Sequence, residues 1–147
     1  MKCAQTFNDD FLQLSLPFDD IEYILLDPSC SGSGIRNRND DPTIIDEERL
    51  ERLCALQIRM ITHALTNFPK VKRVTYSTCS IHRQENEDVV ENILEQFGDQ
   101  YELVDFLPTW PCRGLTERTH ACLRASPEQT LTNGFFVACF QRIIKQI

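Results

Sequence analysis

Two cysteines at the ends of strand-like segments are the residues of this sequence best suited to chemistry. Cys30 follows the apolar run 23–27 in a turn rich in serine and glycine, and Cys79 follows a second run, 71–78. If both runs are parallel strands, the thiols lie at the carboxyl-terminal edge of a sheet, where open α/β sheets bind ligands. Because a cysteine attacks as its thiolate, the pair indicates covalent chemistry on an electrophilic substrate. The common alternative is that both cysteines are small, buried hydrophobic residues without a chemical role.

The residues around each cysteine favour this chemistry. Cys79 precedes an expected helix, whose dipole and free N–H groups stabilise an anion. Asp27 ends the first strand, where its carboxylate would accept hydrogen bonds from a cofactor ammonium or the amino group of a base. An aspartate before proline is also a common turn residue, so Asp27 alone is a weak signal. An acid and two thiols at one edge form a more specific pattern.

Positive residues follow both cysteines although the chain as a whole is acidic. The formal net charge is −7 and the pI is about 4.9, which argues against nucleic-acid binding by overall electrostatic attraction. Arg36 and Arg38 follow the Cys30 turn, and Arg83 follows Cys79. If the two loops are neighbours, three guanidinium groups surround one crevice. Three solvated surface arginines are the alternative.

The elements that must position these residues alternate between strands and helices. The expected order is strand 21–27, helix 46–67, strand 71–76, helix 80–97, strand 101–104, a long connection over 105–133, and strand 134–140. This β-α-β-α-β order predicts an α/β sheet whose first strands are parallel.

Length and composition fit one globular domain of 147 residues, with 41% hydrophobic and 25% charged residues. No apolar stretch approaches the roughly 20 residues of a membrane helix, and none at the amino terminus has signal-peptide length. Seven cysteines cannot all pair internally and do not resemble a secreted disulfide framework, which favours a reducing intracellular compartment. His120 and Cys122 lack the partners of a zinc site, so no metal site is expected.

At these residues the sequence resembles the Nol/Nop/Sun family of RNA cytosine-5 methyltransferases. The family's fourth motif, an aspartate followed by a Pro-Cys-Ser-Gly turn, is matched by residues 27–32, and its sixth motif, Thr-Cys-Ser after a strand, by residues 76–80. The acidic run 85–87 and the closing strand 134–138 also fit. The order Pro-Ser-Cys in place of Ala-Pro-Cys is most similar to the fifth Sun-domain branch, which implies ribosomal RNA as the substrate class.

The resemblance implies a Rossmann-like, S-adenosylmethionine-dependent enzyme that makes 5-methylcytosine in RNA, in the nucleus or nucleolus. Cys79 would add to carbon 6 of cytosine and so activate carbon 5, and Cys30 would assist product release. Asp27 would hold either the cofactor's methionine end or the cytosine amino edge. Asp10, from a weaker match to the third motif, would contact the adenine. DNA cytosine-5 methyltransferases use the Pro-Cys cysteine instead, so the choice of Cys79 rests on the family.

The resemblance covers nearly the whole chain but only the carboxyl-side part of the family's catalytic domain, mostly strands four to seven. The family's cofactor loop, Asp-x-Cys-Ala-Ala-Pro-Gly, and the acid that binds the ribose are absent from the sequence. We therefore expect residues 1–147 to be an incomplete domain that binds the cofactor weakly or not at all without an amino-terminal half. The apolar run 24–26 would then be an exposed strand edge that promotes self-association.

Two other functions stay open on the sequence alone. A non-catalytic RNA- or protein-binding remnant would keep the fold without turnover, and the missing cofactor loop favours it for this chain alone. An amino-group methyltransferase would carry Asp-Pro-Pro-aromatic after the fourth strand, and Ser29 and Cys30 depart from that pattern.

Overall fold

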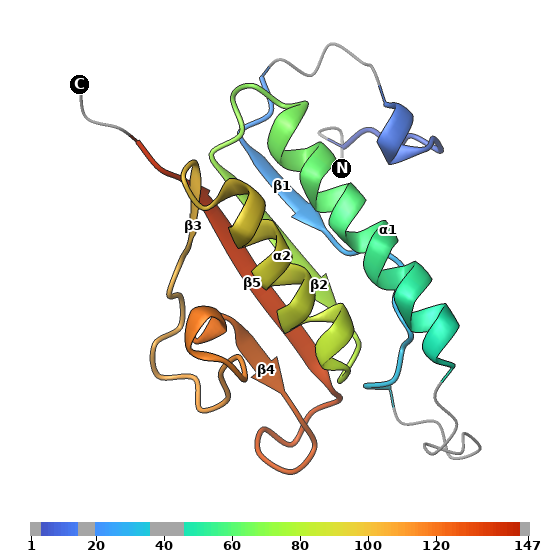
Figure 1. Ribbon diagram of the computed structural model, residues 1–147, viewed down its shortest axis with the longest axis vertical. Helices are drawn as coiled ribbons and strands as arrows, with labels where there is room; N and C mark the ends of the chain where they lie inside the picture. Colours follow the sequence, from blue (N-terminus) through green and yellow to red (C-terminus); the bar gives the residue numbers. More distant parts are fainter. Residues whose placement is uncertain (1–3, 15–19, 36–45, 145–147) are drawn as a thin grey trace.

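The strands form one mixed sheet in the computed structural model, which describes residues 4–14, 20–35 and 46–144 (Figure 1). In chain order they are β1 (Tyr23–Leu26), β2 (Arg73–Thr78), β3 (Tyr101–Leu103), β4 (Leu123–Ala125) and β5 (Phe135–Arg142). The order across the sheet is β1-β2-β5-β3, and β4 also pairs with β5. β1 and β2 are parallel, as predicted, whereas β5 is antiparallel to β2, β3 and β4.

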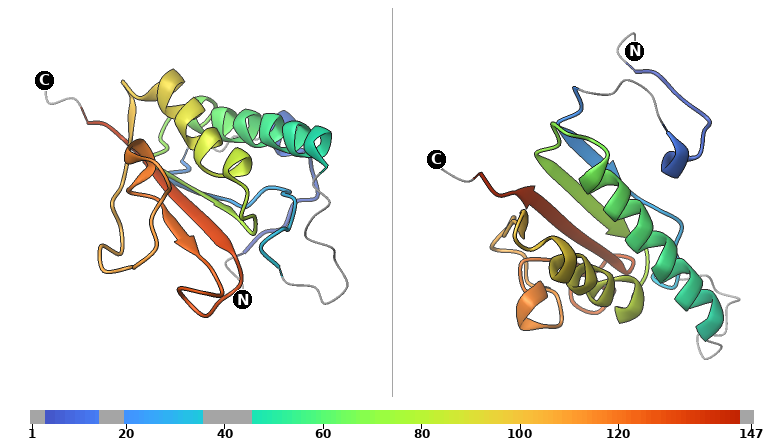
Figure 2. Two further views of the ribbon diagram at one scale, coloured as in Figure 1. Left: turned by 60° about the horizontal axis from the view of Figure 1, so that its bottom comes forward. Right: turned by 45° about the horizontal axis from the view of Figure 1, so that its top comes forward.

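Two helices cover one face of this sheet (Figures 1 and 2). The first, α1 (Glu47–Thr66), is the crossover that a parallel β1–β2 pair requires. It begins after Asp46, whose side chain accepts a hydrogen bond from the backbone N–H of Arg49. The second, α2 (Glu87–Phe97), ends at Gly98, as the sequence predicted. None of the described helices is long and apolar enough to cross a bilayer.

The predicted second helix is correct in its end but wrong in its start. A helix was expected from residue 80, whereas the α-helix begins at Glu87 and is preceded by the short 3-10 helix η2 (Arg83–Glu85). The reason is that the side chains of Glu85 and Asn86 are buried and hydrogen-bond to the loops around Cys30 and Cys79 rather than lying on a helical surface. The predicted connection 105–133 also contains an unexpected 3-10 helix, η3 (Glu117–Thr119), together with β4.

The hydrophobic core lies between the two helices and the sheet. Its members include Ile61, Ala64 and Leu65 of α1, Val89, Val90 and Ile93 of α2, and Tyr76, Phe136, Ala138 and Phe140 of the sheet. These positions follow the predicted apolar stripes of the helices. Among the described residues, no helix covers the opposite face, and there Tyr23 and Leu25 of β1 are 65% and 76% exposed. β1 is an apolar edge strand, as expected; self-association through it stays a prediction.

Candidate active site

The structure brings the two predicted cysteines into direct contact. The Sγ atoms of Cys30 and Cys79 are 3.2 Å apart. This is a hydrogen-bonding distance for sulfur and well above the roughly 2.05 Å of a disulfide bond, and both thiols are free. Both residues are partly exposed.

Strand register explains why these two loops meet. Leu26 near the end of β1 pairs with Tyr76 near the end of β2, so the parallel strands finish at the same edge of the sheet. The turn that carries Cys30 and the segment that carries Cys79 leave this edge side by side. The topology that the sequence predicted thus brings both cysteines to one edge of the sheet.

Three serine hydroxyls connect the two loops. The Oγ atoms of Ser31, Ser33 and Ser80 lie 3.0 to 3.2 Å from one another. The backbone N–H of Ile81 also donates to Ser33 Oγ at 3.1 Å. These contacts hold the segment after Cys30 against the segment after Cys79.

Two glycines allow a close approach of three backbone segments at this edge. The N–H of Gly34 donates to the carbonyl of Cys79, and the N–H of Gly134 donates to the carbonyl of Gly34, both at 2.9 Å. A Cβ atom on Gly34 would lie only 2.2 Å from the Gly134 carbonyl oxygen. A side chain at position 34 would therefore push the Cys30 turn away from the start of β5.

Asp27 lies at the same edge as the sulfurs. Its Oδ1 atom accepts a hydrogen bond of 3.0 Å from the hydroxyl of Ser77, two residues before Cys79. The residue is exposed, so its carboxylate is open to a ligand.

Asp10 does not join this group. Its carboxylate caps the 3-10 helix η1 (Phe11–Gln13) by accepting from the N–H of Leu12. The ring of Phe11 contacts His63 in the last turn of α1, with the ring centroids 4.9 Å apart. The predicted contact of Asp10 with an adenine stays a prediction.

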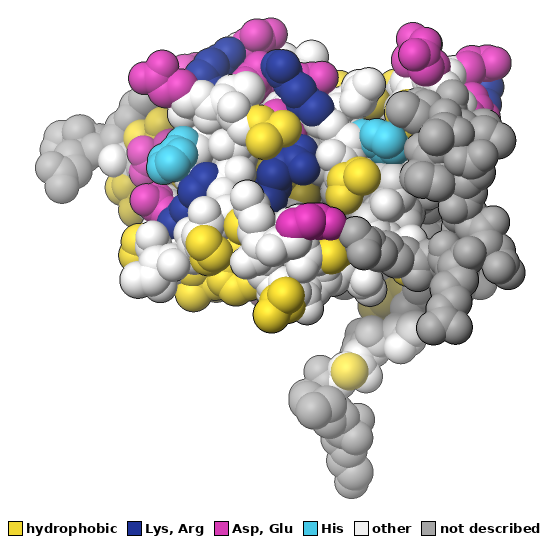
Figure 3. Space-filling model, turned by 90° about the horizontal axis from the view of Figure 1, so that it is seen from below, with side chains coloured by type: hydrophobic (Ala, Val, Ile, Leu, Met, Phe, Trp, Pro, Cys, Tyr) yellow, Lys and Arg dark blue, Asp and Glu magenta, His cyan; other side chains and the backbone are white. Residues whose placement is uncertain are grey.

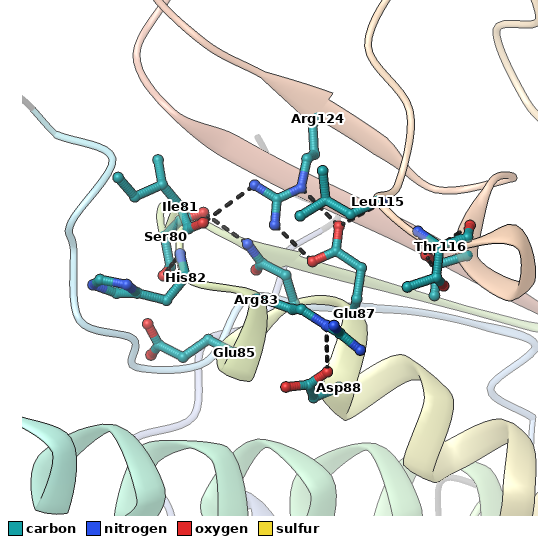
Figure 4. Close-up of polar contacts among 12 residues, drawn as sticks. Ser80, Ile81, His82, Arg83, Glu85, Glu87, Asp88, Leu115, Thr116 and Arg124 are labelled. Atoms are coloured by element: carbon teal, nitrogen blue, oxygen red, sulfur yellow. Dashed lines mark hydrogen bonds and ion pairs between the residues drawn. The ribbon is translucent and has the colours of Figure 1, made fainter.

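Of the three arginines that were predicted to surround one crevice, the structure describes only Arg83. Arg36 and Arg38 lie outside the described residues. The guanidinium of Arg83 pairs with Asp88 at 2.8 Å and lies 4.0 Å from Glu91, so acidic side chains balance its charge (Figure 4). Acidic and basic side chains are both exposed on the face viewed from this end of the molecule (Figure 3).

The surroundings of the Cys30 thiol favour its neutral form. Burial, and next the hydrogen bond with Cys79, raise the pKa of the Cys30 thiol from an ordinary 9.0 to about 11. Cys30 therefore keeps its proton at neutral pH. A thiol that keeps its proton can donate a hydrogen bond to a neighbouring sulfur anion, which suits Cys30 to support a nucleophile rather than to be one.

The raised pKa predicts slow alkylation of Cys30. Because the thiolate is the reacting form, Cys30 should react with iodoacetamide at pH 8 on the order of tenfold more slowly than an unperturbed thiol. The smaller thiolate fraction outweighs the greater nucleophilicity of a thiolate of higher pKa. Peptide mass spectrometry across pH 7–11.5 would measure the rate at this residue. Replacing Cys79 by alanine removes one cause of the raised pKa of Cys30. The pH midpoint of the alkylation rate should therefore be lower in this variant than in the chain without substitutions. A midpoint at or below 9 in the unchanged chain would contradict the assignment.

Sequence reasoning missed the buried polar side chains behind the cysteines. Gln57, Glu85 and Asn86 are fully buried, and Glu87 forms an ion pair with Arg124 of β4 (Figure 4). From the sequence, residues 85–87 were interpreted only as the acidic start of a helix. One signal was available, because Gln57 is a polar residue inside the apolar stripe of α1.

A mixed sheet with both helices on one face, and with paired thiols and a carboxylate at the edge where its parallel strands end, defines this chain as having a Rossmann-like methyltransferase fold. A family model described as "16S rRNA methyltransferase RsmB/F" matches residues 2–141. The chain belongs to this family of methyltransferases. The predicted membership of the Nol/Nop/Sun family is confirmed.

Individual relatives agree with this assignment. The chain is 45% identical over 150 residues to the 28S rRNA (cytosine-C(5))-methyltransferase of Mus musculus, covering 97% of this chain and 32% of that protein. It is 44% identical over 150 residues to the 26S rRNA (cytosine-C(5))-methyltransferase nsun-5 of Caenorhabditis elegans, covering 95% and 34%. The predicted similarity to the fifth Sun-domain branch is thereby confirmed.

A solved structure supports the fold. The crystal structure of a methyltransferase homologue from Pyrococcus horikoshii superimposes with a TM-score of 0.67 at 27% sequence identity, covering 83% of this chain and 39% of that one. The chain spans about a third of the length of each of the two curated relatives named in the preceding paragraph.

Proposed function

We propose that this chain is part of an S-adenosylmethionine-dependent enzyme that methylates carbon 5 of cytosine in ribosomal RNA. The observation that carries the proposal is the 3.2 Å contact between Cys30 and Cys79 at the edge that also holds Asp27. The names of the relatives support the reaction and the substrate class. The resemblance to the family implies the nucleus or nucleolus as the proposed location, and the free thiols fit a reducing compartment.

The proposed reaction uses the two sulfurs in different ways. The Cys79 thiolate forms a bond to carbon 6 of an unstacked cytosine, and the electron pair of the carbon 5–carbon 6 double bond becomes available at carbon 5. S-adenosylmethionine, when bound, supplies the electrophilic methyl group that carbon 5 takes up. Loss of the carbon 5 proton to a base then restores the double bond and breaks the bond from carbon 6 to the Cys79 sulfur. Cys30, which keeps its proton, would hydrogen-bond the departing sulfur.

The residues present fit only one end of the cofactor. Asp27 is exposed, and Ser77 fixes one of its oxygens, so its carboxylate would accept a hydrogen bond from the cofactor's ammonium group or from the cytosine amino edge. The sequence holds no Asp-x-Cys-Ala-Ala-Pro-Gly loop for the rest of the cofactor. We therefore expect weak cofactor binding by this chain alone. The same feature favours the second candidate function, a non-catalytic binding remnant.

A complementation assay separates the two candidates. The chain would be incubated with ribosomal RNA and S-adenosylmethionine labelled in its methyl group, with and without the amino-terminal part of the mouse relative. We expect label in 5-methylcytosine only when that part is supplied, because the resemblance to the family implies that the cofactor loop lies there. RNA binding without any 5-methylcytosine in either mixture would favour the remnant and contradict the enzyme.

A further inference from the structure

Three polar side chains behind the cysteines have no contact with solvent. Gln57 of α1, Glu85 of η2 and Asn86, which precedes α2, are each 0% exposed. Burying an amide or a carboxylate is costly unless hydrogen bonds replace its contacts with water. The partners of these side chains therefore indicate what their burial achieves.

Two of these side chains hold both peptide groups that flank Cys30. The Nε2 atom of Gln57 donates to the carbonyl of Ser29 at 3.1 Å and to Glu85 Oε1 at 3.0 Å. The same Glu85 oxygen accepts from the backbone N–H of Ser31 at 2.8 Å. The peptide group before Cys30 and the peptide group after it are thus tied to one Gln57–Glu85 pair.

The third side chain holds the residues on either side of Cys79. The Oδ1 atom of Asn86 accepts from the hydroxyl of Thr78 at 2.6 Å, and its Nδ2 atom donates to the carbonyl of Ser80 at 2.9 Å. Thr78 Oγ1 accepts in turn from the N–H of Ser80. Asn86 thus fixes Cys79 from both sides.

The two sets of contacts are connected through the chain itself. Glu85 and Asn86 are consecutive residues, so one peptide bond links the side chain that holds the Cys30 turn to the side chain that holds Cys79. The backbone of this link is fixed, because the buried hydroxyl of Tyr76 donates to the carbonyl of Glu85 at 2.6 Å. The separation of the two sulfurs therefore depends on a short and rigid connection.

We propose that Gln57, Glu85 and Asn86 are positioning residues that hold the sulfurs of Cys30 and Cys79 in contact. The catalytic meaning of this contact rests on the proposed function, whereas the contact itself does not. Without these side chains, only the serine contacts and the hydrogen bond from the Gly34 N–H to the Cys79 carbonyl would hold the two loops together. Small displacements of reacting groups are costly in catalysis.

The test measures how fast the full chain forms a disulfide between Cys30 and Cys79, because this reaction requires the sulfurs to meet and uses neither RNA nor cofactor. Diamide takes up the two thiol hydrogens as the sulfur–sulfur bond forms, and peptide mass spectrometry follows the product. We expect Glu85→Ala and Asn86→Ala to slow the reaction about tenfold or more, since each removes side-chain contacts that hold one cysteine loop. Glu85→Gln keeps an acceptor for Ser31 and should restore the rate to within about threefold.

A buried hydrogen bond at the other end of α1 provides the matched control. Tyr101→Phe removes the bond from the Tyr101 hydroxyl to the carbonyl of Leu65 and should leave the rate unchanged. If circular dichroism shows that an alanine variant does not fold, Asn86→Asp, which keeps the acceptor and loses the donor, and Gln57→Met take its place and should also slow the reaction. Folded variants that react as fast as Tyr101→Phe would overturn the inference.

The outcomes for positioning and for the proposed function are separable. Slow disulfide formation in the variants, together with no methyl transfer in the complementation assay, would support the positioning residues and contradict only the enzymatic proposal. Methyl transfer together with an unchanged disulfide rate in the variants would do the reverse.

Discussion

Replacing Cys79 by alanine should abolish any covalent RNA adduct and lower methyl transfer on the order of a thousandfold or more, as loss of a nucleophile commonly does. Replacing Cys30 by alanine should instead make the adduct accumulate. The bond to carbon 6 would still form in that variant, but the departing Cys79 sulfur would lose its hydrogen-bond donor 3.2 Å away. The two variants should thus have opposite effects on the amount of adduct.

The measurement is a denaturing gel of the chain mixed with ribosomal RNA, cofactor and the amino-terminal part of a relative. A covalent complex survives denaturation and migrates as a shifted band. Cys54→Ala is the control, because Cys54 packs on the apolar side of α1 against the core and forms no part of the sulfur pair. An adduct that survives the loss of Cys79 but not the loss of Cys30 would reverse the two roles.

The parts of the site that the sequence could predict follow from strand ends. Apolar runs located β1 and β2, and the helical pattern between them required a crossover, so the strands had to be parallel and to finish at one edge. The position of Cys30 and Cys79 at one edge needed no further information. The sequence pattern for β5 was equally clear, but its direction depends on the chain reversal in residues 105–133, which no local pattern encodes.

The parts that the sequence could not predict depend on partners distant in the chain. β4 has three residues with no alternating pattern and exists because it pairs with β5 and because the Trp110 indole N–H donates to the carbonyl of Arg124. Glu85 and Asn86 are polar residues of the kind found at the start of a helix. Their burial becomes understandable only when the cysteine loops, to which they hydrogen-bond, are placed beside them. Gln57 likewise becomes interpretable once Ser29 lies beside it.

The second large effect is expected at the buried ion pair between α2 and β4 (Figure 4). Arg124 donates from Nε and Nη2 to the two carboxylate oxygens of Glu87, at 2.7 Å and 2.6 Å. The side chain of Glu87 is 0% exposed and that of Arg124 is 16% exposed. This bidentate geometry compensates the cost of burying both charges.

The same pair connects α2 and β4 to two further segments of the chain. Arg124 Nη1 donates to the carbonyl of Ile81, two residues after Cys79, and the N–H of Leu115 donates to Glu87 Oε1. The carboxylate also lies in the first turn of α2, where the helix dipole favours a negative charge. Loss of the guanidinium would leave this carboxylate buried without a counter-charge.

Arg124→Met should therefore lower the free energy of unfolding by about 3–5 kcal/mol, which is typical when one partner of a buried ion pair is removed. Urea denaturation followed by circular dichroism would measure it. The double variant Glu87→Leu with Arg124→Met should recover most of the loss, because apolar side chains often replace a buried pair at little cost. Arg118→Met breaks an exposed pair with Glu95 and should cost less than about 1 kcal/mol. Equal losses for Arg124→Met and Arg118→Met would show that the buried pair contributes no more than a surface one.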